Sequence, residues 1–163
     1  MRSSPADPGG GLLGGEILGD TLDQLRRAVQ PRREVGGWAT VDLDRAEIEI
    51  CAALTIRDGA PPSVNAGLQE QLLGARCRLL GDPARGQVVL LEPSTEGRLA
   101  AGLARFGEGS LALYLLGDDD APARARQAGL TLSTEGSGPF GPERLVITGP
   151  RDGPFLILAG LGS

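Results

Sequence analysis

Apolar and polar residues follow two different spacings along the chain. Apolar residues three and four positions apart predict helices over residues 16–29, 45–56, 95–106 and 118–127. Short alternating or continuous apolar runs predict strands over residues 36–43, 75–80, 87–92, 110–116, 130–134, 144–148 and 155–159. Asp44 and Ser94 precede helical segments and are the expected N-caps. Short strands interspersed with helices predict an α+β protein.

The order of these elements repeats, which indicates an internal duplication. CRLLGDPARGQVVLL, starting at Cys77, aligns without gaps with RLVITGPRDGPFLIL, starting at Arg144. The alignment places Pro83 on Pro150, within a turn between two apolar strands in both halves. A tight turn of this kind also recurs by chance. The first half has no clear counterpart of the strand at 130–134: its second strand is either degenerate or lies somewhere in residues 65–73. We nevertheless expect two related modules that pack together.

The composition excludes several classes of function. The chain has 163 residues, no His and a formal net charge of −5, and all 16 basic residues are Arg. Without His there is no Ser-His-Asp or Cys-His catalysis, and the commonest transition-metal ligand is missing. Phosphate backbones are bound by basic faces, so we expect no nucleic acid partner.

The two cysteines and the hydropathy pattern bear on location. Cys51 and Cys77 are too few for a disulfide scaffold and are expected to be core thiols. No run of about 18 apolar residues exists, which predicts no membrane span. The N-terminus lacks an apolar stretch of the length that a secretion signal requires. We therefore expect a cytoplasmic protein without a membrane partner.

Three segments resemble the vicinal oxygen chelate superfamily, which includes glyoxalase I, methylmalonyl-CoA epimerase and the bleomycin-resistance proteins. They are TVDLDRA (40–46), VVLLEPSTEGRLAAGLARFGEGSLALYLL (88–116) and GPRDGPFLIL (149–158). The resemblance implies two βαβββ modules that form a curved mixed sheet, with an extra N-terminal helix. It also implies a homodimer, since family members of this size commonly pair. The expected organisation is a flexible tail (1–15), an N-terminal helix (16–34) and one glyoxalase-like domain (35–160), divided into module one (35–93), a linker helix (94–109) and module two (110–160).

The metal ligands that the resemblance implies are absent from the sequence. Enzymes of the superfamily hold a divalent metal through residues on the first, fifth and eighth strands. The matching positions here are Val35 or Gly36, Leu111 or Ala112, and Ile157. None of these side chains can ligate a metal. The expectation is a protein without a metal or any other cofactor.

Strand alternation and the repeat together predict which residues line the cup of the curved sheet. If Ala112 marks the cup side, Tyr114 shares it, and the repeat places Trp38 there too. The expected ligand-binding residues are Trp38, Arg76, Arg78, Glu92, Tyr114, Phe155 and Ile157. Such a pocket suits a small organic ligand of anionic character. The alternative is a cup filled by its own side chains, with both arginines in water.

These observations favour a metal-free protein that binds or sequesters a small molecule, of the glyoxalase and bleomycin-resistance type, with no catalytic residue assigned. Two alternatives stay open. One is a lyase- or isomerase-type enzyme of the same superfamily that works without the usual metal. The other is a protein-interaction module, which an exposed apolar surface would favour.

Overall fold

The computed structural model describes residues 15–147 and 154–160. The helices are α1 (Gly15–Val29), α2 (Leu43–Asp58), α3 (Arg98–Phe106) and α4 (Ala121–Gln127). The strands are β1 (Arg33–Ala39), β2 (Val64–Glu70), β3 (Ala75–Asp82), β4 (Gly86–Pro93), β5 (Gly109–Gly117), β6 (Gly136–Gly138), β7 (Gly141–Leu145) and β8 (Phe155–Gly160). The expected tail at 1–15 lies outside the described residues, apart from Gly15, which begins α1.

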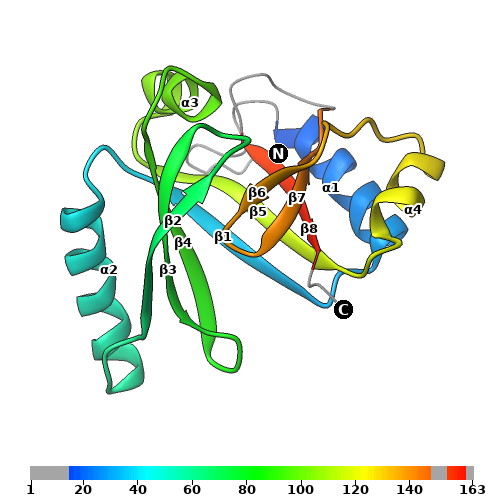
Figure 1. The fold of residues 1–163 in the computed structure, drawn as a ribbon. Coiled ribbons are helices and arrows are strands. Elements are labelled where there is room, and N and C mark those ends of the chain that lie inside the picture. The colour runs from blue at the N-terminus through cyan, green and yellow to red at the C-terminus, as the bar shows by residue number, and fades with distance from the viewer. Residues whose placement is uncertain (1–14, 148–153, 161–163) are drawn as a thin grey trace, which may run out of the picture.

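The strands form one mixed sheet of eight in the order β2-β3-β4-β1-β5-β8-β7-β6. β1 pairs parallel with β4, β5 pairs parallel with β8, and β1 and β5 run antiparallel at the centre. Each half therefore has the order strand, helix and three strands, and α3 connects the halves (Figure 1). The prediction of an α+β fold built from two βαβββ modules is confirmed.

The sheet curls until its two outer strands nearly meet. At this seam the Gln71 amide donates to the Ser137 carbonyl oxygen over 2.9 Å, and the Ser137 amide donates to Gln71 Oε1 over 2.9 Å. Gln71 follows β2 and Ser137 lies in β6, so the contact joins the opposite ends of the strand order. The inner face of the sheet is thereby wrapped around an interior of buried side chains.

Helices cover the outer face in two places. α1 and α4 pack together over β5 and β8, where Leu25, Ala125 and Leu156 are buried in one cluster. The Arg124 guanidinium donates to the carbonyl oxygens of Ala28 and Val29 over 3.1 and 2.9 Å, so α4 supplies partners for the last carbonyls of α1. α2 lies over β3 and β4 on the other half of the sheet (Figure 1).

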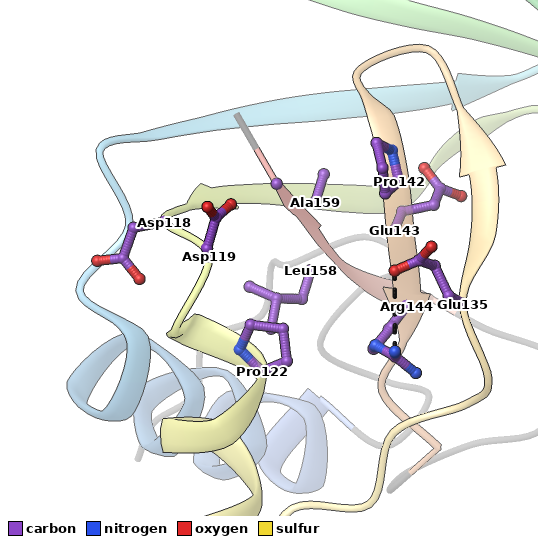
Figure 2. A pocket seen from close by; sticks show the side chains of 10 residues that line it. Asp118, Asp119, Pro122, Glu135, Pro142, Glu143, Arg144, Leu158 and Ala159 are labelled. Atoms are coloured by element: carbon purple, nitrogen blue, oxygen red, sulfur yellow. Dashed lines mark ion pairs between the residues drawn. The ribbon is translucent and has the colours of Figure 1, made fainter. Parts of the chain in front are cut away.

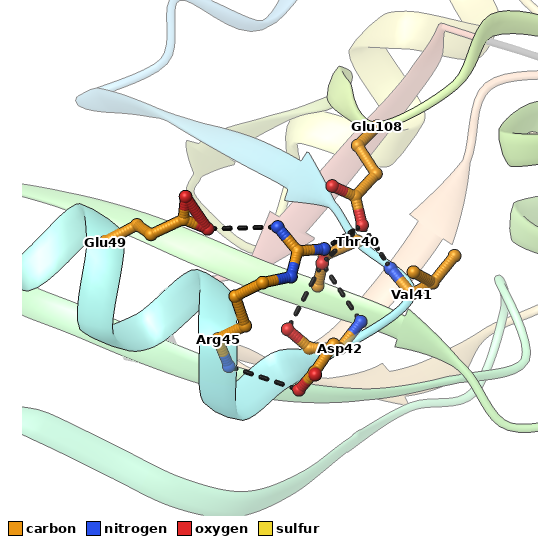
Figure 3. Close-up of polar contacts among 6 residues, drawn as sticks. All are labelled: Thr40, Val41, Asp42, Arg45, Glu49 and Glu108. Atoms are coloured by element: carbon orange, nitrogen blue, oxygen red, sulfur yellow. Dashed lines mark hydrogen bonds and ion pairs between the residues drawn. The ribbon is translucent and has the colours of Figure 1, made fainter.

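The junction between β1 and α2 is held by Glu108, from the Gly-Glu-Gly segment that follows α3 (Figure 3). Its Oε2 accepts hydrogen bonds from the Val41 amide at 2.8 Å and the Thr40 hydroxyl at 2.9 Å, and the Arg45 guanidinium lies 2.6 Å away. The Val41 amide, followed by the Thr40 hydroxyl, lowers the pKa of Glu108. This carboxylate therefore ties the linker between the modules to the first module.

Several predicted boundaries are wrong. Asp42, rather than Asp44, caps α2, because Asp42 Oδ1 accepts the Arg45 amide at 3.1 Å while Asp44 already lies in the first turn. No hydrogen bond from the Ser94 side chain caps α3, which begins at Arg98. The strand expected at 130–134 is reduced to an isolated bridge between Leu132 and Val146, and the next strand begins at Gly136.

Candidate functional site

The interior of the curled sheet is apolar except for three side chains that lie together. Glu70 ends β2, Tyr114 lies in the middle of β5, and Glu143 lies in β7. Their relative exposures are 0%, 0% and 2%. Glutamate is among the side chains least often buried this completely, so two in one apolar interior are an unusual arrangement.

Glu70 is the centre of this group. Its Oε2 accepts a hydrogen bond from the Tyr114 hydroxyl at 2.8 Å, and its Oε1 accepts the Leu72 amide at 3.1 Å. Glu143 lies against Glu70, and neither of its carboxyl oxygens has a donor among the described residues. A proton on Glu143 therefore supplies the hydrogen bond between the two acids.

The surroundings push the two acids toward different protonation states. Burial, followed by contact with Glu70, raises the pKa of Glu143 to about 11. Burial also raises the pKa of Glu70, but hydrogen bonds from Glu143, Tyr114 and the Leu72 amide oppose that increase. At neutral pH the pair is a carboxylic acid at Glu143 beside the carboxyl of Glu70, which accepts hydrogen bonds from Tyr114 and the Leu72 amide. We call Glu70, Tyr114 and Glu143 the interior acid cluster.

The neighbouring hydroxyl and thiol are protonated at neutral pH. Burial raises the pKa of Tyr114, and the charges of Glu70 and Glu143 raise it further. Burial raises the pKa of Cys77, on β3, to about 12. Cys77 is therefore a core thiol rather than a nucleophile.

The hairpin of β6 and β7 covers the cluster closely. A Cβ at Gly138 would lie 1.9 Å from Glu143 Oε1, so only glycine leaves room for that carboxyl. Between the two strands, the Phe140 ring packs edge-on against Tyr114 with their centroids 5.5 Å apart. On the opposite wall, a Cβ at Gly37 would lie 2.8 Å from the Cβ of Ala112.

A small cavity of about 180 Å³ lies beside β7 and β8 at the start of α4 (Figure 2). Acidic residues dominate its polar lining: Asp118, Asp119 and Glu135 lie around Arg144, and Glu143 adjoins the cavity from β7 while its carboxyl lies in the interior. Arg144 pairs with Glu135 at 3.8 Å. Its small volume and acidic wall differ from the apolar pocket that the sequence predicts.

Comparisons with known proteins identify the architecture. The structure superimposes on methylmalonyl-CoA epimerase from Mycobacterium tuberculosis with a TM-score of 0.62 and 23% identity, over 82% of this chain and 89% of that one. The chain has the glyoxalase-like fold. The Streptomyces coelicolor methylmalonyl-CoA epimerase, solved with 2-nitronate-propionyl-CoA, gives a TM-score of 0.59 and 22% identity over 80% and 94% of the two chains.

A hypothetical protein from Bacillus halodurans shares the glyoxalase-like fold with a TM-score of 0.60 and 15% identity, over 77% of this chain and 90% of that one. No protein-family model and no curated protein matches the sequence. At these identities the likeness shows the fold and leaves the activity to be argued from the site.

The donors in this glyoxalase-like interior do not fit a divalent metal. Val35, Ala112 and Ile157, where the sequence resemblance leads us to expect metal ligands, are buried and apolar. Glu143 holds a proton against Glu70, and a protonated carboxyl is a poor ligand. In the part of the chain that the structure describes, no three His, Cys, Asp or Glu side chains cluster as a metal site requires. That the protein works without a metal stays a prediction.

The structure brings together only part of the predicted pocket. Tyr114, Phe155 and Ile157 face the interior, as expected. The expectation that Trp38 faces it is wrong: Trp38 is 37% exposed on the outer face, while its neighbours Gly37 and Ala39 point inward. The gapless alignment placed the first half one residue out of step with the second. A shift of one residue moves every side chain of a strand to the opposite face of the sheet.

The same shift misplaced Glu92, whereas the two arginines were misplaced because Cys77 was expected to pack under the helix and instead lies in the interior. Arg76, Arg78 and Glu92 also lie on the outer face, and Arg76 forms an ion pair with Glu92 across β3 and β4. Arg78 pairs with Asp44 at 2.7 Å and with Glu47 at 2.9 Å, both on α2. Because these partners neutralise the arginines, the reason for expecting an anion in the cup is lost.

Sequence reasoning missed Glu70 and Glu143, although both follow a readable pattern. Glu70 is two residues after Leu68, and Glu143 is two residues before Leu145, so each lies in phase with an apolar side chain that packs in the interior. A glutamate in phase with the buried face of a strand is the signal that would have identified them.

Proposed function

We propose that the protein binds a small organic molecule inside its glyoxalase-like sheet, without a metal, through the interior acid cluster. The observation that carries the proposal is the burial of Glu70 and Glu143 in an otherwise apolar interior. Enclosing two ionisable groups costs stability that apolar residues of similar volume would retain. Ionisable groups with strongly shifted pKa values cluster at functional sites.

The cluster determines which ligand chemistry it can accept. Burial keeps Glu143 protonated at neutral pH, so its carboxyl can donate a hydrogen bond, and the Glu70 oxygens accept from the Tyr114 hydroxyl and the Leu72 amide. A ligand would take over the hydrogen bond between the two acids. A carbonyl oxygen on the ligand would accept a hydrogen bond from Glu143, and a polarised C–H or N–H group would donate to Glu70. An uncharged carbonyl compound therefore suits this interior better than the anion expected from Arg76 and Arg78, because both arginines lie outside the interior and an anion would be buried beside two carboxyl groups.

Entry requires the β6–β7 hairpin to move. β6 has three residues, and its seam with the β2 end includes the two hydrogen bonds between Gln71 and Ser137. Phe140, which covers Tyr114, is only partly buried. Short elements with few buried contacts open at low free-energy cost, so this hairpin is the route we propose for the ligand.

The separation of the two pKa values favours a second candidate, an isomerase- or lyase-type enzyme. Two carboxyls whose environments differ in this way provide one acid and one base. In an isomerisation, Glu70 would take the proton from the carbon next to a carbonyl, and Glu143 would protonate the carbonyl oxygen as the enol forms. As a proton returns from Glu70 to carbon, the enol oxygen would give its proton back to Glu143, which restores both groups. The structural likeness to methylmalonyl-CoA epimerases supports considering this chemistry.

Proton exchange and binding can be measured on the same samples. A panel of small, uncharged 2-substituted carbonyl compounds would be incubated with the protein in D₂O and followed by proton NMR. Exchange at C2 that disappears in Glu70→Gln and Glu143→Gln supports the enzyme. Saturation-transfer signals that weaken in these variants without exchange support binding alone.

The exposed Glu96 provides a matched control, since Glu96→Gln leaves the interior unchanged. If no compound gives either signal, or if all three variants behave as the wild type does, the interior acid cluster is not the site.

A further inference from the structure

A second cavity lies outside the sheet, beneath the C-terminal half of α2. The first turns of α2 pack on β3 and β4, where Leu43 and Ala46 are buried against Leu80 and Leu90. Toward its end the helix leaves a cavity of about 700 Å³ between itself, the loop that follows it and the β3–β4 turn. Figure 1 shows α2 standing beside this hairpin.

The wall of this cavity is mainly apolar and includes the indole of Trp38. Ile50 and Leu54 line it from α2, Val88 from β4 and Pro61 from the loop. Trp38, the only tryptophan of the chain, lies on its floor in β1. A volume of 700 Å³ is within the range of sites for small organic molecules. Water cannot form hydrogen bonds with apolar walls, so an apolar ligand would add van der Waals contacts that the cavity lacks.

The rim of the cavity carries positive charge that the protein leaves unused. Within the described residues, the Arg85 guanidinium has no ion-pair partner, although its backbone amide donates to Asp82 Oδ1 over 3.0 Å. Arg57 pairs only with its neighbour Asp58, at 3.4 Å in an exposed position. An anionic group on the ligand would pair with Arg85 at the rim, whereas the carboxylate of Asp82 accepts hydrogen bonds from the backbone amides of Ala84 and Arg85 in the turn.

We propose that this cavity, the Trp38 cavity, is a second binding site, which takes a flat aromatic molecule bearing a carboxylate or sulfonate. The ring lies against Trp38 between the apolar walls, and the acid group meets Arg85 at the rim. The site is on the opposite face of the sheet from the interior acid cluster, so it stands or falls independently of the function proposed above.

The position of Trp38 makes the test direct. 1-Anilinonaphthalene-8-sulfonate combines an aromatic body with a sulfonate, and N-phenyl-1-naphthylamine has a closely similar body without the charge. On titration with the sulfonate, we expect saturable one-to-one quenching of Trp38 fluorescence and an increase in melting temperature. The uncharged probe should bind at least about fivefold more weakly, the contribution of one charge-assisted hydrogen bond at a partly exposed site.

Two pairs of variants locate the bound probe. Leu54→Asp puts a carboxylate in the cavity and should weaken sulfonate binding more than about tenfold, whereas Ile48→Asp, on the same helix but 71% exposed, should not. Arg85→Gln should weaken the sulfonate about fivefold and leave the uncharged probe unchanged. Arg126→Gln, at an exposed position on α4, is its control.

Absence of saturable quenching would overturn the proposal. So would equal affinities in Leu54→Asp and Ile48→Asp, or binding that depends on Glu143→Gln and not on Arg85, which would place the probe inside the sheet. A dimer that buries Trp38 and excludes the probe would show that the cavity belongs to an interface between copies of the chain.

Discussion

Replacing Glu143 by Gln should change how stability depends on pH. The pKa of Glu143 is raised in the folded protein to about 11, so the folded state keeps a proton that the unfolded chain releases above its ordinary pKa. Acid therefore favours folding, and stability falls as the pH rises through neutrality. Gln keeps the shape of the protonated acid, can still donate to Glu70, and has no proton to lose.

The magnitude follows from the linkage alone. While Glu143 is protonated in the folded state and ionised in the unfolded state, each pH unit lowers the free energy of unfolding by about 1.4 kcal/mol. Between pH 6 and pH 8 the free energy of unfolding of the wild type should fall by about 2.7 kcal/mol relative to that of Glu143→Gln. The variant should therefore become more stable relative to the wild type as the pH rises.

Urea unfolding followed by far-UV circular dichroism at pH 6, 7 and 8 measures this difference. Glu96→Gln, which removes an exposed carboxyl, should keep the wild-type slope. Parallel pH dependences for wild type and Glu143→Gln would refute the reasoning, because they would mean that Glu143 is ionised in the folded protein.

Other expectations concern packing, anchoring, metal and assembly. Gly138→Ala should lower the free energy of unfolding by about 1–3 kcal/mol, because the new Cβ would meet Glu143 Oε1 at 1.9 Å; Gly36→Ala, with open space around its Cβ, should change it little in the same thermal melts. Glu108→Gln should cost about 1 kcal/mol at neutral pH, and this difference should vanish in acid, since the lowered pKa of Glu108 means that its stabilising effect is lost as the carboxylate is protonated. Elemental analysis should find no near-equimolar, chelator-resistant metal, and finding one would contradict the proposed metal-free chemistry. Light scattering should give the mass of a dimer, a prediction that a monomeric mass at high concentration would rule out.

Within residues 15–147 and 154–160, no helix combines the length and hydrophobicity needed to cross a membrane. The cytoplasmic location stays a prediction.

The sequence by itself determined the four helices and most of the strands in their order, although it did not bound β2 and placed a strand at 130–134 where β6 follows instead. Residues 16–29 and 87–92 were predicted almost to the boundaries of α1 and β4, because their apolar spacing belongs to a helix and to a buried strand. The weak strands were predicted least well. β6 has only three residues, Gly-Ser-Gly, and this composition has no β-pattern to read.

Which face each strand turns inward depended on tertiary structure. The pairing of Gly37 with Val89 and of Tyr114 with Ile157 sets the inward faces of the two halves, and the bulge between Gly37 and Trp38 shifts the register of β1 against β5. The spacing of apolar residues along the sequence does not show which residues pair across neighbouring strands. A one-residue error in aligning the halves therefore placed Trp38 inside.

The interior acid cluster also depended on the closed sheet. Glu70 lies in β2, the strand at one edge of the sheet, and Glu143 lies in β7, next to the other edge. Only the curling of the sheet brings these two residues together. Their shared proton results from burial and from this contact, neither of which exists in the unfolded chain. Local sequence determines where helices and strands form, whereas the pKa of a carboxyl depends on groups that are distant in sequence and adjacent only after folding.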